Sequence, residues 1–260
     1  MHKPMLLGSA TLLALALAAP SISSAQTEPP PPQWQVITTT QIKPEFRAEY
    51  EAGQKEMTAA YKKAGVSYRV VVQTMFGDLM EYTAVTPLSK FAEMDEPSPL
   101  AKALGDAGSQ KLLKRLGAYL VSARRVGYLV LGNISLESEG DPGEYLHIMT
   151  FHLRPGKGGD FAAFMKDSYL PALRKAGVSN AWMSEPVFGG DTSDRVLVMP
   201  MHKVAEIDAG PATRRGLGVE GAQLLGIKQS EMVASVSHMV GHIRVDLSNL
   251  PPAAPSKGTK

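Results

Sequence analysis

Several stretches with strand character place histidine and other polar side chains at every second position. Because successive residues of a strand point to opposite faces, each such set shares one face of a sheet. The more apolar set should face helices, so the polar set should line a common interior space. An imidazole exchanges protons near neutral pH, so the candidate catalytic residues are His152, His238 and His242. The candidate ligand-binding residues are Thr39, Gln41, Arg124, Tyr128 and Thr150.

The histidine spacing argues against a metal site. His238 and His242 are four residues apart, which is about 13 Å along a strand at roughly 3.3 Å per residue. Two ligands that each lie about 2 Å from one zinc ion cannot span that distance without a bulge. His152 could approach one of them, but no Asp or Glu is placed on the same face. The sequence therefore predicts no metal and names no cofactor; hydrogen-bonded interior histidines are the alternative to a catalytic role.

The composition excludes several other kinds of chemistry. The chain has 260 residues, 27 Lys and Arg against 25 Asp and Glu, and no Cys. A formal charge of +2 is too small for a nucleic-acid groove, so no nucleic-acid partner is expected. The lack of Cys excludes disulfides, a thiol nucleophile and Cys-ligated metals. The Gly-x-Ser-x-Gly pattern of a serine nucleophile is absent as well.

An internal repeat determines how these residues are positioned. The segment Lys63-Ala64-Gly65-Val66-Ser67 recurs as Lys175-Ala176-Gly177-Val178-Ser179. Further matches follow in the same order over about 105 residues, and the last aligns Val126-Gly127 with Val240-Gly241. Two copies of one fold are predicted, over 34–137 and 143–250. In this alignment Gln41, Arg124 and Tyr128 correspond to His152, His238 and His242, so proton transfer is expected at the histidine-bearing end.

Each copy has the same order of predicted elements: strand, helix, strand, strand, helix, strand. In the second copy these are 145–153, 159–176, 180–187, 195–201, 202–227 and 232–245, with a kink expected at Pro171. This βαββαβ order is the ferredoxin-like pattern, whose sheet is covered by helices on one face only. The predicted fold class is therefore α+β, with two tandem ferredoxin-like repeats whose sheets face each other as a pseudo-symmetric α+β barrel.

The chain resembles the dimeric α/β-barrel superfamily, which includes antibiotic-biosynthesis-type monooxygenases and NIPSNAP-like proteins. The helix ending Tyr169-Leu170-Pro171-Ala172-Leu173-Arg174-Lys175-Ala176-Gly177 is similar to a stretch common in the NIPSNAP-like branch. The resemblance implies a ligand cavity either between the sheet and its helices or inside the barrel. Here one chain would build the barrel that the family usually builds from two. It also brings haem binding into consideration, because chlorite-dismutase-like and dye-peroxidase-like proteins share the fold. Haem would need a proximal histidine (His152, His202 or His238) and a distal arginine (Arg124 or Arg195).

The two ends of the chain predict export. Residues 1–25 read as a signal peptide, with a short basic start, an uncharged Leu/Ala-rich run and the small residues Ser23-Ser24-Ala25 before Gln26. A Pro-rich linker, 26–33, follows, and 251–260 is expected to be a disordered tail. The predicted location is periplasmic or secreted, with no membrane association after cleavage.

Two functions remain open at this point. The first is binding of a small, partly apolar organic ligand, with cofactor-independent monooxygenase or isomerase chemistry as its enzymatic form. The second is a non-catalytic interaction or stress-associated module with a filled barrel core. A cavity of several hundred Å³ would favour the first function. The expected partners are a small molecule and, through the helix faces, further copies of the chain, unless it is a monomer.

Overall fold

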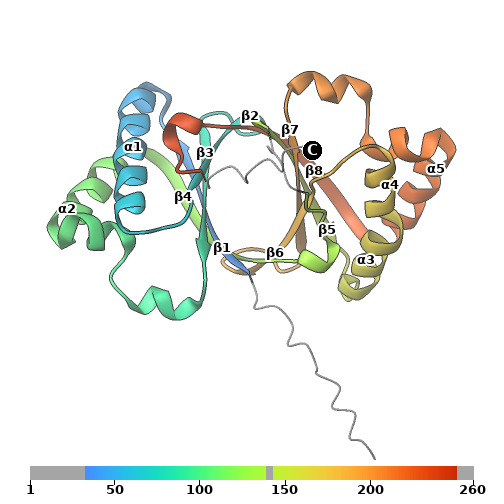
Figure 1. The fold of residues 1–260 in the computed structure, drawn as a ribbon, viewed down its shortest axis with the longest axis horizontal. Helices are drawn as coiled ribbons and strands as arrows, with labels where there is room; N and C mark the ends of the chain where they lie inside the picture. Colours follow the sequence, from blue (N-terminus) through green and yellow to red (C-terminus); the bar gives the residue numbers. More distant parts are fainter. Residues whose placement is uncertain (1–32, 139–142, 251–260) are drawn as a thin grey trace, which may run out of the picture. The chain divides into compact units, whose positions relative to one another are not determined.

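The computed structural model of the chain describes residues 33–138 and 143–250, which contain a closed eight-stranded barrel (Figure 1). The strand order around the barrel is β1-β3-β2-β8-β5-β7-β6-β4. The strands of the first repeat are β1 (Trp34–Ile42), β2 (Val70–Phe76), β3 (Glu81–Leu88) and β4 (Leu120–Val130). Those of the second are β5 (Tyr145–Leu153), β6 (Trp182–Phe188), β7 (Asp194–Met201) and β8 (Val233–Ile243). The predicted signal peptide, the tail and all of the linker except Gln33 lie outside the described residues.

Helices cover the outer face of each sheet (Figure 1). The first repeat contributes α1 (Arg47–Lys63) and α2 (Pro99–Gly117). The second contributes α3 (Gly158–Phe164), α4 (Leu170–Lys175) and α5 (Ala212–Ser230). The α+β fold of two tandem ferredoxin-like repeats is confirmed. Among the described residues, no helix combines the length and the hydropathy needed to cross a bilayer.

Corresponding helices of the two repeats share an unusual break. Within α2, Gly105 has φ 72°, and within α5, Gly218 has φ 73°. A positive φ is readily adopted only by glycine, so both repeats use the same residue type to turn the helix at the same point. Near Pro171, where a kink is expected, a π-helical segment, Met165–Tyr169, separates α3 from α4. Proline removes one backbone donor from a helix and disturbs its regular bonding there.

The barrel closes where the edges of the two sheets pair. Strand β2 pairs with β8, with Val72 opposite Ile243, and β4 pairs with β6, with Tyr128 opposite Pro186. Edge strands that pair leave no open row of backbone donors and acceptors. All eight pairings are antiparallel, so β1 and β5, four places apart in the ring, run in the same direction. Their last residues therefore lie at the same mouth of the barrel, on opposite sides of it, and not at two different ends.

Apolar side chains fill the layers between the sheet and the helices. In the second repeat, Phe151, Phe161, Phe164, Met165 and Leu173 are almost completely buried in one cluster. The first repeat has a separate cluster, which includes Ile42, Tyr50, Tyr82, Leu112 and Leu116. Burial of these side chains stabilises each half by roughly 1.5–3 kcal/mol per large residue relative to exposure. The outer layers are thus packed cores, and the interior of the barrel is a different kind of space.

Candidate functional site

The barrel encloses a cavity of about 1660 Å³. Every strand contributes inward-facing residues to its wall, as the alternation of strand side chains requires. The apolar part of the wall includes Ile37, Val70, Val72, Val85, Val126, Leu146, Ile148, Trp182, Val196, Val198, Met239 and Ile243. A volume of this size exceeds that of most small-molecule sites, which span roughly 300–1,000 Å³. The wall of the cavity therefore carries both apolar and polar side chains.

All five predicted ligand-binding residues line this cavity. Thr39 and Gln41 come from β1, Arg124 and Tyr128 from β4, and Thr150 from β5. The face assignment of these three strands is therefore confirmed. Thr39 shares a hydrogen bond with Thr83 across the β1–β3 ladder, with their hydroxyl oxygens 3.2 Å apart. The role of the five residues in binding stays a prediction.

Two of the three predicted catalytic histidines lie outside the barrel, so their inward assignment is wrong. Ser237 and Met239 of β8 line the cavity, which puts His238 and His242 on the outer face. The ring of His238 is bonded to His147, with Nδ1 and Nε2 3.0 Å apart, and His242 stacks on Tyr145. His238 therefore makes a structural hydrogen bond, as in the alternative to a catalytic role, but on the outer face of the barrel and not in its interior.

A register error of one residue explains the wrong assignment. The sequence alignment matched Val126-Gly127 with Val240-Gly241. In the structure, Ile42 pairs with Leu120 after a bulge, and Leu153 pairs with Val233 after the equivalent bulge. These pairs make Met239 the counterpart of Val126, because 233 − 120 and 239 − 126 are both 113. A shift of one residue moves every side chain of a strand to the other face.

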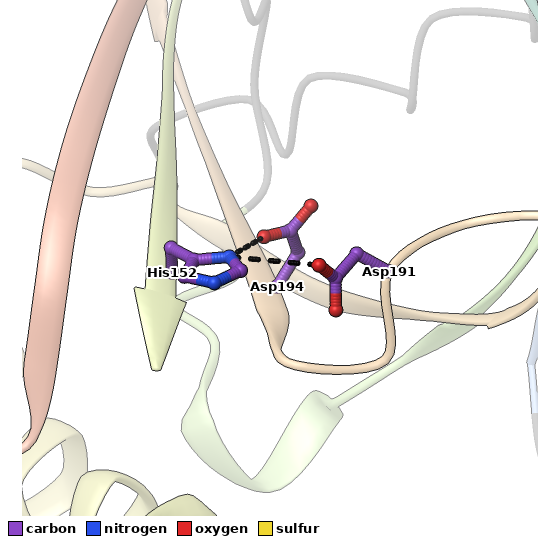
Figure 2. A group of neighbouring side chains, drawn as sticks. All are labelled: His152, Asp191 and Asp194. Carbon is purple, nitrogen blue, oxygen red and sulfur yellow. Dashed lines mark hydrogen bonds and ion pairs between the residues drawn. The ribbon is translucent and has the colours of Figure 1, made fainter. Parts of the chain in front are cut away.

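His152, the third predicted catalytic residue, occupies the inner face of β5 at the mouth of the barrel. Its Nδ1 lies 2.9 Å from Oδ1 of Asp194 and 3.8 Å from Oδ2 of Asp191 (Figure 2). Asp194 begins β7 directly opposite His152, and Asp191 belongs to the β6–β7 turn. The expectation that no acidic residue shares the face of His152 is therefore wrong. The signal was present, because Asp194 has the same parity as the inward-facing Val196 and Val198.

Hydrogen bonds and burial at this mouth shift the pKa values of three residues. The hydrogen bond to Asp194 raises the pKa of His152 above its ordinary value, which favours the cation. Hydrogen bonds from the hydroxyl and the backbone N–H of Ser193 lower the pKa of Asp191. Burial, followed by the charge of Asp194, raises the pKa of Tyr128. Tyr128 therefore stays a neutral hydrogen-bonding group beside an ionised cluster.

The first repeat contributes the basic side of the same mouth. Arg124 of β4 donates from Nε and one terminal nitrogen to the carbonyl oxygen of Gly189, at 3.2 and 3.1 Å. Its charge also helps to lower the pKa of Asp191, which places the guanidinium near the turn that carries this residue. We call His152, Asp191, Asp194, Arg124 and Tyr128 together the polar mouth. It combines an imidazole, two carboxylates, a guanidinium and a phenol drawn from both repeats.

The opposite side of the mouth has different chemistry. Gln41, the counterpart of His152, donates from Nε2 to the carbonyl oxygen of Leu79 at 2.5 Å. Glu81 lies opposite Gln41 in the β1–β3 ladder and accepts a hydrogen bond from the Thr74 hydroxyl at 3.2 Å. Burial raises the pKa of Glu81, and Asp78 adds to the shift. An amide thus replaces the imidazole, so the two sides of the mouth are chemically distinct.

The residues that the sequence offered for haem do not fit it. Within 33–138 and 143–250, no histidine belongs to the wall of the cavity, and His152 at its mouth is engaged by Asp194 and Ser193. His238 lies outside and is bonded to His147. The space between the second sheet and its helices is filled by the phenylalanine-rich cluster described above. His202 is exposed directly after β7. None of the three candidate proximal histidines therefore belongs to the wall of the cavity.

Comparison with solved structures shows the same fold at low sequence identity. A protein from Lactobacillus acidophilus assigned as a monooxygenase is 8% identical, with a TM-score of 0.58 over 86% of this chain and 98% of that one. An anthrone oxidase-like protein is 14% identical, with a TM-score of 0.53 over 82% and 91%. A chlorite dismutase from Candidatus Nitrospira defluvii is 9% identical, with a TM-score of 0.53 over 83% and 92%.

These likenesses establish that the chain has the dimeric α/β-barrel fold, as the resemblance in the sequence implied. At such identities they establish the fold alone, because one fold supports many chemistries. No protein-family model matches the chain, and no curated protein matches it. The cavity and its mouth are therefore the features of this chain that bear on its function.

Proposed function

We propose that this protein binds a small, partly apolar organic molecule inside its barrel. The observation that carries the proposal is the cavity of about 1660 Å³, whose wall combines Val, Ile, Leu, Met and Trp182 side chains with polar ones. Transfer of apolar ligand surface from water into such a space contributes roughly 25 cal/mol per Å². A filled core, which the interaction-module alternative requires, is hard to reconcile with a space of this size.

The polar mouth supports a specific orientation of the ligand. Arg124 and Tyr128 both face the cavity, where a guanidinium and a phenol can donate hydrogen bonds to an oxygen of the ligand. A hydrogen bond to a charged group contributes about 1.5–3 kcal/mol, so these groups favour a ligand with an anionic or strongly accepting oxygen at one end. The apolar part of that ligand would lie deeper, against Val72, Leu146 and Val198.

Two measurements on the purified native protein test the proposal. Native mass spectrometry of protein taken directly from its source should detect a retained organic molecule at one per chain. The chain has two Trp residues, and Trp182 lines the cavity whereas Trp34 packs edge-on against Phe91. Ligand entry should therefore change the fluorescence of Trp182, and replacement of Trp34 by Phe should preserve that change. A saturable signal that survives Trp182→Phe but not Trp34→Phe would contradict binding in the barrel.

Catalysis is the second candidate function, in the form of oxidation or isomerisation without a cofactor. His152 at the rim of the cavity, oriented by Asp194, is placed to exchange a proton with the polar end of a bound molecule. The likeness to the anthrone oxidase-like protein suggests anthrone as a first substrate to test. Oxygen consumption with anthrone that depends on the protein and is lost in His152→Ala supports this activity. Consumption no faster than the uncatalysed rate contradicts it for this substrate.

A further inference from the structure

Three potential metal ligands from separate segments meet at the polar mouth. Nδ1 of His152 and one carboxylate oxygen each of Asp191 and Asp194 all lie within 4.8 Å of one another (Figure 2). Ligand atoms held at about 2.1 Å from one ion are at most about 4.2 Å apart. The distances from His152 Nδ1, 2.9 Å to Asp194 and 3.8 Å to Asp191, fall inside that limit. The carboxylate oxygens of Asp191 and Asp194 lie within 4.8 Å of each other, which is at most about 0.6 Å beyond that limit.

We infer that His152, Asp191 and Asp194 bind one divalent transition-metal ion at the mouth of the barrel. An imidazole nitrogen with two carboxylate oxygens suits Zn²⁺, Mn²⁺, Fe²⁺ or Co²⁺, whereas Mg²⁺ and Ca²⁺ prefer oxygen ligands alone. Three protein ligands leave at least one coordination position open. Because Asp191 and Asp194 both line the cavity, the open position faces the space where a ligand would lie.

Ser193 already orients one of the three ligands. Its hydroxyl and its backbone N–H both donate to Oδ1 of Asp191, at 2.7 and 2.9 Å. The other oxygen, Oδ2, is the one directed toward Nδ1 of His152. Hydrogen bonds of this kind fix the orientation of a metal-binding carboxylate and typically change metal affinity by about 10- to 100-fold. The turn is therefore arranged so that a free carboxylate oxygen faces the imidazole.

In the absence of an ion, a proton shared by Nδ1 of His152 and Oδ1 of Asp194 satisfies this pair. An ion that binds to both atoms takes the place of that proton.

The first repeat provides an internal control for the metal site. The residues at the corresponding positions are Gln41, Asp78 and Glu81, because β3 and β7 start at residues that are 113 apart, 81 and 194. Gln41 has no imidazole, and its amide is bonded to the Leu79 carbonyl. The inference therefore predicts one ion per chain, on the side of the second repeat. Any role of the ion toward an organic molecule rests on the proposed function, but the ion site itself does not.

The experiment is a titration of the full chain with Mn²⁺ and with Zn²⁺ after treatment with a chelator and without any organic ligand. Electron paramagnetic resonance of free Mn²⁺ and calorimetry with Zn²⁺ should both give one ion per chain. His152→Gln, which installs the first-repeat residue, should weaken binding by more than 100-fold, and Ser193→Ala by about 10- to 100-fold. The matched controls His238→Gln and Asp78→Asn should bind as tightly as the unmodified chain.

Three results would overturn the inference: no binding of either ion above that of a non-binding protein, two equivalent ions per chain, or equal losses in His152→Gln and His238→Gln. His152 is partly exposed at the end of a strand, and circular dichroism will establish that its variant folds. If it does not, Asp191→Asn in the exposed turn tests the same site, with the same loss expected. Failure here leaves the Trp182 test of organic-ligand binding unaffected, so the two proposals are separable.

Discussion

His152 of β5 and Asp194 of β7 lie directly opposite each other in the barrel and are joined by a 2.9 Å contact between Nδ1 and Oδ1. The corresponding pair of the first repeat is Gln41 and Glu81, also directly opposite in the ladder. The backbone positions are thus repeated, but only one copy carries an imidazole beside its carboxylate. The consequences of this difference can be tested with single substitutions.

Two adjacent arginines give a matched test of the cavity. Arg124 faces the interior, whereas Arg125 faces outward and bonds to Thr38 at 3.4 Å. Arg124→Gln should weaken binding of an anionic ligand by about 10-fold or more, because a charged hydrogen bond worth about 1.5–3 kcal/mol is lost. Arg125→Gln removes the same charge without touching the cavity and should leave the affinity within twofold. Fluorescence titration of Trp182 measures both, and equal losses would point to long-range attraction instead of contact.

Substitution of a histidine on the outer face of the barrel should not change ligand affinity. His238→Ala removes a ring that is bonded to His147 on the outer face, so ligand affinity should remain within twofold. The lost hydrogen bond should lower the free energy of unfolding by about 1 kcal/mol. His152→Ala should do the opposite, with a clear loss of affinity for oxygen-bearing ligands and little change in stability, since its side chain is 44% exposed. A weaker ligand affinity in His238→Ala alone would argue against the barrel interior as the binding site.

Low pH should weaken the ion pair that joins Arg244 of the second repeat to Glu51 of the first repeat. Arg244, just after β8, donates to both oxygens of Glu51 on α1, at 2.7 and 2.9 Å, and lowers the pKa of Glu51 from 4.5 to about 2. A lowered pKa in the folded state stabilises the protein above pH 4.5, and this contribution is lost as the pH falls toward 2. After allowance for solvent screening it is on the order of 1–2 kcal/mol.

The Glu51 contribution can be measured by denaturant unfolding of the unmodified chain and Glu51→Gln. The difference in their free energies of unfolding should shrink between pH 4.5 and 2. Glu49→Gln, on the exposed side of the same helix, removes the same charge without touching the contact with Arg244 and is the control. A difference that stays constant over this range would mean that the ion pair does not contribute.

Neither repeat should behave as a monomer by itself. Expressed separately, 34–137 and 143–250 would each expose the apolar inner face of a sheet and two unpaired edges, which β2–β8 and β4–β6 pairing covers in the whole chain. Size-exclusion chromatography should find aggregates or dimers, and mixing should restore a one-to-one complex. A soluble, cooperatively folded monomer of either half would show that the sheets do not depend on each other.

Export is proposed from the first 25 residues, whose basic start, apolar run and Ser23-Ser24-Ala25 ending are typical of a signal peptide. The mature protein should therefore begin at Gln26 and be found in the periplasm or the medium. N-terminal sequencing of protein from the fractionated source cells measures this. Recovery of an intact chain starting at Met1 from the cytoplasm would contradict export.

The repeat made the fold predictable, because a chain that encodes one βαββαβ unit twice must cover two sheet faces. Period-two alternation placed Gln41, Arg124 and Thr150 correctly. It failed in β8, because the alignment of Val126-Gly127 with Val240-Gly241 differs by one residue from the register that follows the bulges in the structure. Asp191 could not be predicted to meet His152, because Asp191 lies in the β6–β7 turn and a turn residue has no alternation to follow.

The covalent link between the repeats also affects how many ways a ligand can bind. A barrel made of two identical chains has a two-fold axis, so every binding pose inside it has an equivalent pose turned by half a revolution. Here His152 stands where symmetry would place a second Gln41, and Arg124 has no arginine counterpart, because its equivalent is Ser237. The two halves of the cavity wall therefore differ, and the two poses related by the pseudo-two-fold axis are not equivalent. Giving up the second pose costs only about 0.4 kcal/mol in statistical weight, and in return every molecule that enters presents the same edge to the same side chains.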